Sequence, residues 1–98
     1  MEVKKLVNDS ELTISIVGRI DSNTSPDLEK ELKCSIEGIK TLVLDFEGVE
    51  YISSAGLRVL LSMQKIFRTQ GKMIIKNVNE SVLEVFEITG FSEILTIQ

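Results

Sequence analysis

Hydrophobic and polar residues alternate regularly near the amino terminus of the chain. Leu12, Ile14 and Ile16 are separated by polar residues, and this period of two is typical of a strand with one solvent-facing side. A weaker strand over 3–7 precedes them, and the turn-forming residues Asn8-Asp9-Ser10 lie between the two segments. The pattern therefore predicts an opening β-hairpin.

Two later segments have the spacing of amphipathic helices. After a polar loop over 19–24, Ser25 is expected to cap a helix that has Pro26 in its first turn and ends at Gly38. A second helix is predicted from about Ser53 to Thr69, where apolar residues recur every three or four positions. Each helix has one apolar face, which indicates that it covers one side of a sheet.

Apolar runs in the middle and late parts of the chain predict buried strands. The run over 41–46 is nearly continuous, as expected of a central strand, and the polar residues over 47–50 predict a turn after it. A further strand is predicted over 72–76, followed by a third helix that Asn79 caps. Residues 94–97 are expected to form a short edge strand.

The resulting element order is β-β-α-β-α-β-α-β. It predicts fold class α/β, with a mixed, largely parallel sheet, an opening hairpin and helices that cover the sheet. At 98 residues and 11.0 kDa the chain has room for one hydrophobic core, so residues 1–98 are expected to form a single domain.

Composition removes several classes of function. The chain has no histidine, which excludes the commonest general base and the usual transition-metal ligand. Its net charge of -4 argues against a nucleic-acid partner, and it has no apolar run long enough to enter a membrane, so a cytoplasmic protein is expected. Cys34 is the single cysteine, cannot form an internal disulfide, and is expected to be buried and inert.

Sequence motifs for catalysis are also missing. No phosphate-binding loop, dinucleotide fingerprint, Cys-x-x-Cys pair or nucleophile elbow occurs, so no catalytic residue, cofactor or metal is expected. Asp45, Glu47 and Glu50 could hold Mg²⁺ in a small hydrolase, but a solvated acidic turn is the favoured interpretation.

Two serines at the predicted strand-to-helix junction are the candidate functional residues. Either Ser53 or Ser54 could cap the helix by accepting a backbone hydrogen bond, but one cap needs only one serine. Gly56 lies in the first turn, where it costs up to about 1 kcal/mol relative to alanine, and this indicates a close approach. A helix start also favours negative charge, so a phosphoserine could be accommodated there.

The segment Val49–Leu61, the run Leu42–Phe46 and the earlier Gly18–Asp21 resemble the STAS domain of bacterial anti-sigma factor antagonists, over essentially the whole chain. The resemblance implies a non-catalytic switch. The dephosphorylated protein would bind an anti-sigma factor that is also a serine kinase, and so free a sigma factor. Phosphorylation of one serine by that kinase would break the complex, and a PP2C-type phosphatase would restore it.

By position, the resemblance makes Ser54 the phosphoacceptor and places Asp21 on the partner surface. Many phosphorylated members have aspartate directly before the acceptor, whereas this chain has Ser53, which is therefore a rival acceptor. Ser53, Gly56 and Leu57 are expected to join Asp21 and Ser54 in the docking surface. The alternative function is a constitutive STAS interaction subunit of a transporter or stress-signalling scaffold, in which the serines only cap the helix.

Overall fold

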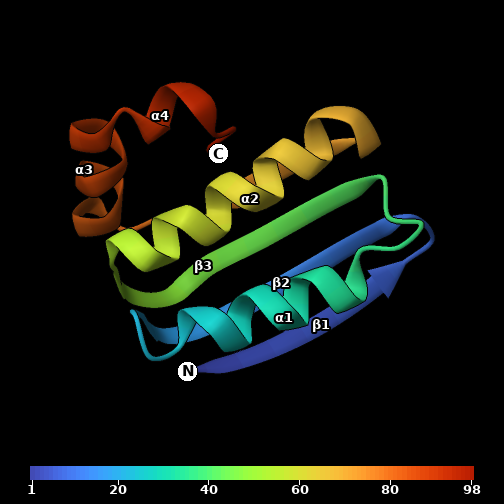
Figure 1. Ribbon diagram of the computed structural model, residues 1–98, viewed down its shortest axis with the longest axis horizontal. Coiled ribbons are helices and arrows are strands. Elements are labelled where there is room, and N and C mark those ends of the chain that lie inside the picture. Colours follow the sequence, from blue (N-terminus) through green and yellow to red (C-terminus); the bar gives the residue numbers. More distant parts are fainter.

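Four strands form one mixed sheet in the order β1-β2-β3-β4 in the computed structural model, which describes residues 1–98 (Figure 1). β1 (Glu2–Asn8) pairs antiparallel with β2 (Glu11–Ile20). β3 (Thr41–Ile52) runs parallel to β2, and β4 (Lys72–Lys76) runs parallel to β3. The predicted α/β class, the opening hairpin and the largely parallel sheet are confirmed.

Two helices, α1 (Ser25–Ser35) and α2 (Ser54–Gln70), run side by side over one face of the sheet (Figure 1). α3 (Glu80–Thr89) lies at the end of the sheet where α2 begins, and the short α4 (Phe91–Ile94) follows it. As predicted, the side chain of Asn79 caps α3, where it accepts a hydrogen bond from the backbone N–H of Val82. None of the helices combines the length and the apolar sequence that crossing a membrane requires.

The hydrophobic core lies between the sheet and its covering helices α1 and α2, and buried residues of α3 and Leu95 also belong to it. It is one continuous cluster of 23 buried residues, and the alternating residues of β2 contribute one side of it. Its fully buried members include residues of β2 (Leu12, Ile14, Ile16), of β3 (Leu42, Leu44) and of the helices (Leu28, Leu32, Leu60, Met63). The apolar residues that alternate along β2, and those that recur every three or four positions along the helices, therefore face the core, as predicted from the sequence.

The third strand is longer than predicted, so the turn expected over 47–50 is wrong. Two register shifts, one after Ser15 and one after Gly18, each give β3 one residue more than β2. These bulges let polar residues occur within the strand while Val49 and Ile52 stay buried. A break in alternation caused by a bulge has the same sequence pattern as a turn.

The first helix starts differently from the prediction. Ser25 is its first residue and not its N-cap, and its buried hydroxyl donates a 2.5 Å hydrogen bond to the carbonyl of Asp21. Thr24 occupies the cap position, but its hydroxyl donates to the carbonyl of Arg19 and accepts from the backbone N–H of Asp21. Both hydroxyls therefore hold the preceding loop.

Two further predictions are wrong. The chain after Gly90 forms α4, and only one bridge, between Ile97 and Ile75, remains of the edge strand expected over 94–97. Cys34 is exposed, because the buried face of α1 carries residues at fourfold spacing and Cys34 lies off that face. The prediction that Cys34 is buried relied on the usual burial of cysteine, whereas its position on α1 determines its exposure.

Candidate functional site

The carboxyl ends of β2 and β3 lie together, and the loop before α1 and the first turn of α2 follow them. Ile20 pairs with Ile52, and the backbone N–H of Ser53 donates to the carbonyl of Ile20 at 2.8 Å. Because the two strands are parallel, the segments that leave them meet at one edge of the sheet, where binding sites of α/β proteins usually lie. This arrangement brings the loop of Asp21 to the serine pair.

Ser53 is the N-cap of α2. Its backbone is extended, at φ -96° and ψ 176°, and its Oγ accepts a 3.4 Å hydrogen bond from the backbone N–H of Gly56. Its carbonyl accepts from the backbone N–H of Leu57 at 2.9 Å. The Ser53 side chain is half-buried. Its hydroxyl oxygen already accepts the hydrogen bond that caps the helix.

Ser54 is the first residue of α2, and its side chain is exposed. Its hydroxyl takes part in no hydrogen bond within the protein, in contrast to that of Ser53. The first backbone N–H groups of a helix have no carbonyl partner within it, so this end of α2 favours negative charge. The predicted accessible serine at a helix start is confirmed, and of the two serines Ser54 has the free hydroxyl.

Gly56 and Leu57 lie beneath the surface and not on it. A Cβ atom at position 56 would lie 2.7 Å from Cγ2 of Ile20 and 2.7 Å from Cγ1 of Ile52. Leu57 is 6% exposed and belongs to the core cluster. The close approach inferred from Gly56 is present, but it joins α2 to the ends of its own two strands.

Asp21 organises the loop between β2 and α1. Its Oδ1 accepts hydrogen bonds from the backbone N–H groups of Asn23 at 2.9 Å and of Thr24 at 3.1 Å. The N–H of Thr24 is the largest cause that holds the pKa of Asp21 below its ordinary value, and the charge of Arg19 acts in the same direction. Asp21 therefore presents a fixed negative charge beside the serines at neutral pH.

Arg19 and Tyr51 form a cation–π pair at the same edge. The guanidinium of Arg19 lies 4.3 Å from the centre of the Tyr51 ring, and its Nε lies 3.9 Å from Oδ2 of Asp21. Both side chains are exposed. Sequence reasoning missed this pair, because it depends on the register shift that places these residues opposite each other.

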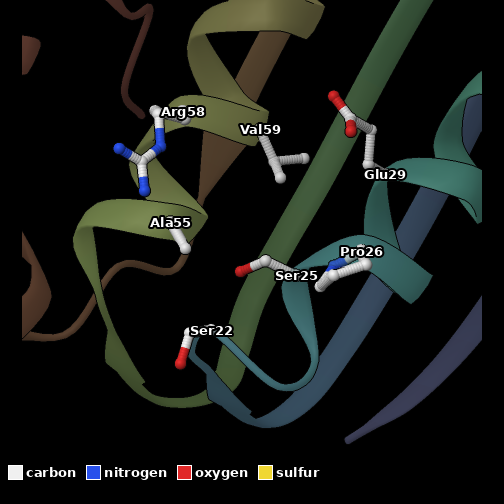
Figure 2. Close-up of a pocket in the computed structure, with 7 residues that line it drawn as sticks. All are labelled: Ser22, Ser25, Pro26, Glu29, Ala55, Arg58 and Val59. Carbon is white, nitrogen blue, oxygen red and sulfur yellow. The ribbon is translucent and has the colours of Figure 1, made fainter.

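A hollow of about 360 Å³ opens between the first turns of α1 and α2 (Figure 2). Figure 2 shows the side chains of Ser22 and Ser25 on one wall and those of Ala55 and Arg58 on the other. The lining mixes polar and apolar groups. The hollow could not be predicted from the sequence, since it lies between two helices that are far apart along the chain. The full lining is Ser22, Ser25, Pro26, Glu29, Ala55, Arg58 and Val59.

The three carboxylates considered as a metal site do not gather. Asp45 accepts hydrogen bonds from the side-chain amide of Asn77 at 2.9 Å and from the backbone N–H of Glu47 at 3.0 Å. The Asn77 amide is the largest cause that lowers the pKa of Asp45. No three acidic or thiol groups lie close enough to hold a metal ion together, so Asp45, Glu47 and Glu50 do not form a three-carboxylate cluster.

Comparison with known proteins gives a consistent result over the whole chain. The family model described as the STAS domain matches residues 2–98. A putative anti-sigma factor antagonist of Bordetella bronchiseptica, BtrV, is 38% identical over 91 residues, which cover 91% of this chain and 78% of BtrV. An anti-sigma-B factor antagonist of Bacillus subtilis is 30% identical over 91 residues, covering 92% of this chain and 84% of that protein.

Solved structures share the fold. A putative anti-sigma factor antagonist from Thermotoga maritima superposes with a TM-score of 0.90 at 19% identity, over 97% of this chain and 84% of the other. The Bacillus cell fate determinant SpoIIAA in its phosphorylated form superposes with a TM-score of 0.76 at 17% identity, over 99% and 91% of the two chains.

Proposed function

The chain belongs to the STAS domain family of anti-sigma factor antagonists, and on that premise we propose that it binds an anti-sigma factor through the surface around Ser54 and releases it when Ser54 is phosphorylated. Proteins of this kind are not enzymes, so the chain supplies a binding surface and a modifiable hydroxyl. The single observation that carries the proposal is the exposed Ser54 hydroxyl, which has no partner within the protein.

We assign the phosphoacceptor to Ser54, and not to Ser53, because the two hydroxyls differ in their hydrogen bonds within the protein. A kinase must reach the oxygen and leave a phosphate that the fold tolerates. Phosphorylation of Ser53 would remove the cap of α2, whose replacement typically costs about 1 kcal/mol. Phosphorylation of Ser54 breaks no hydrogen bond and adds charge at the positive end of the helix.

Phosphorylation would act through charge and not through refolding. A phosphoserine carries about 1.5 to 2 negative charges at neutral pH, and an interface shaped around a neutral hydroxyl would have to desolvate them. An unpaired buried charge costs about 3 to 5 kcal/mol, which weakens binding by about two to nearly four powers of ten. The fixed charge of Asp21, in the neighbouring loop, adds repulsion to the phosphate.

The docking surface has two layers. Asp21, Ser53 and Ser54 supply polar groups at the edge of the sheet, and Arg19 and Tyr51 extend this surface with an exposed cation and an aromatic ring. Tyrosine and arginine are common anchors of protein interfaces. Gly56 and Leu57 contribute from below, because they set the position of the first turn of α2.

The partner enzymes follow from the same proposal. The anti-sigma factor would itself be the serine kinase, of the histidine-kinase-like ATPase type, so that it recognises the surface that it modifies. A PP2C-type phosphatase would remove the phosphate and restore binding. SpoIIAA, which shares the fold, has been solved in both unphosphorylated and phosphorylated forms, and this supports a fold that accepts the modification.

A phosphorylation assay tests the proposal. The chain would be incubated with its purified cognate anti-sigma factor and ATP, and the phosphate would be located by mass spectrometry. We expect one phosphate on the wild-type chain and on Ser53→Ala, and none on Ser54→Ala. Thermal melting of the two variants controls for folding. Labelling of Ser54→Ala to the wild-type extent would show that the acceptor is another residue.

A further inference from the structure

Ser54 and Arg58 lie one helical turn apart on α2, and both are exposed. Residues at this spacing have Cβ atoms about 5–6 Å apart and form neighbouring pairs on a helix surface. Long side chains of a helix lean toward its N-terminus, over the preceding turn. In Figure 2 the Arg58 side chain extends in that direction, from its own turn toward that of Ala55. The guanidinium is therefore directed toward the turn that begins with Ser54.

Arg58 has no anionic partner within the protein. The structure contains three ion pairs, Lys5 with Glu31, Arg19 with Asp21 and Lys33 with Glu29, and Arg58 is in none of them. Its side chain borders the hollow between α1 and α2, which gives it room to change rotamer. The donors of its guanidinium are thus free to bind an anion near the first turn of α2.

We propose that Arg58 binds the phosphate carried by Ser54 and holds it against α2. This inference rests on the proposed function and specifies what becomes of the phosphate after its transfer. A guanidinium can donate two parallel hydrogen bonds to one phosphate. The order of charges, negative at the first position and positive four residues later, is also the favourable one along a helix.

The other charged groups near this end of α2 are already engaged or repel the phosphate. Arg19 stacks on Tyr51 and faces Asp21, so it is held on the strand side of the site. Glu29 pairs with Lys33, and Asp21 and Glu50 are negative. Arg58 is the free cation among them.

The pairing gives the switch a second effect. Before phosphorylation, the surface presents a neutral hydroxyl and an arginine that is open to a partner. Afterwards, Arg58 is bound to the phosphate and its donors are no longer available to a partner. Its single positive charge offsets only part of the about 1.5 to 2 negative charges of the phosphate, so an excess negative charge must still be desolvated in the interface. One modification therefore changes two neighbouring groups at the start of α2, Ser54 in the docking surface and Arg58 beside it, while the backbone keeps its conformation.

The second ionisation of the phosphate measures the pairing directly. Phosphoserine would be installed at position 54 during translation, so that no kinase is needed, and ³¹P NMR would follow its titration in the full chain. Arg58→Gln removes the charge at similar length, and Arg58→Lys keeps the charge without the two-pronged geometry. Arg68→Gln, an exposed arginine in the last turn of the same helix, is the matched control.

We expect Arg58→Gln to raise the phosphate pKa by about 0.15 to 0.4 units, as for a favourable pair at this spacing. Arg58→Lys should raise it by less, and Arg68→Gln should leave it unchanged, because the two sites lie more than a screening length apart. An equal titration in the wild-type chain and Arg58→Gln would overturn the proposal, and so would an equal shift in Arg58→Gln and Arg68→Gln. Neither result depends on whether a kinase modifies Ser54, so failure of the proposed function would be seen separately.

Discussion

The backbone N–H of Ser53 donates a 2.8 Å hydrogen bond to the carbonyl oxygen of Ile20. This bond ties the start of α2 to the end of β2, and the close packing of Gly56 against Ile20 and Ile52 reinforces it. Ser54 therefore projects from a junction whose position is fixed from two sides. A phosphate added there changes the charge of the surface without removing any of these contacts.

Gly56→Ala tests the packing beneath the site. The added Cβ would lie 2.7 Å from two isoleucine side chains, and overpacking of this kind costs about 1–3 kcal/mol. The higher helix propensity of alanine offsets up to about 1 kcal/mol of this loss. Urea unfolding should show a net destabilisation of about 1–2 kcal/mol. A variant as stable as the wild type, or more so, would mean that the first turn of α2 does not rest on these residues.

Gly71→Ala should be the more damaging glycine substitution. Its Cβ would lie 1.8 Å from the carbonyl oxygen of Lys40, which accepts a hydrogen bond from Lys72 at the start of β4. Backbone atoms cannot move aside as a side chain can, so we expect a loss of about 3 kcal/mol or more, or failure to fold. Circular dichroism melts of Gly56→Ala and Gly71→Ala side by side would check the order. A smaller loss at position 71 would contradict it.

The acid limb of the stability curve should depend on Asp45. Its pKa in the folded chain lies below the ordinary value of 3.8, because the Asn77 amide and the Glu47 N–H bind the charged form. The stabilisation is therefore present above about pH 4 and is lost as the pH falls through the folded-state pKa. Thermal melts between pH 7 and pH 3 should show a shallower decline for Asp45→Asn than for the wild type. Parallel curves for the two proteins would show that the carboxylate is not stabilised by folding.

Much of the fold could be predicted from the sequence because its signals are local. The alternation of Leu12, Ile14 and Ile16 predicts the hairpin strand, and Asn79 predicts the start of a helix from hydrogen bonds with near neighbours. The adjacent pair Ser53 and Ser54 likewise indicates a capped helix with one hydroxyl to spare. These features need no knowledge of the remote parts of the chain.

The features that were missed depend on register or on packing between distant segments. The bulges of β3 shift its pairing with β2, so neither the length of β3 nor the meeting of Arg19 with Tyr51 follows from either segment alone. The hollow bordered by Arg58 exists only because α1 and α2 pack side by side. Residue type also misled for Cys34, whose position on the outer side of α1 overrides the usual burial of cysteine.

Tyr51→Ala should separate binding from stability. The ring is 41% exposed, so its loss should cost about 1 kcal/mol of stability or less, including the cation–π contact with Arg19. An aromatic anchor in an interface contributes 2 kcal/mol or more, so affinity for the anti-sigma factor should fall by about 30-fold or more. Ile88→Ala is the matched control, since Ile88 is 77% exposed on α3. Equal affinity for the two variants would remove Tyr51 from the docking surface.

The affinity of the cognate anti-sigma factor for chains with phosphoserine at a chosen position tests the central claim most directly. Isothermal titration calorimetry would compare the unmodified chain with chains that carry phosphoserine at position 54 or at position 10, an exposed serine in the turn between β1 and β2, at the opposite end of the sheet. We predict binding about 150- to 5,000-fold weaker with phosphate at Ser54, and unchanged binding with phosphate at Ser10. Equal affinity for the unmodified chain and the chain phosphorylated at Ser54 would contradict the account and would favour a constitutive binding role.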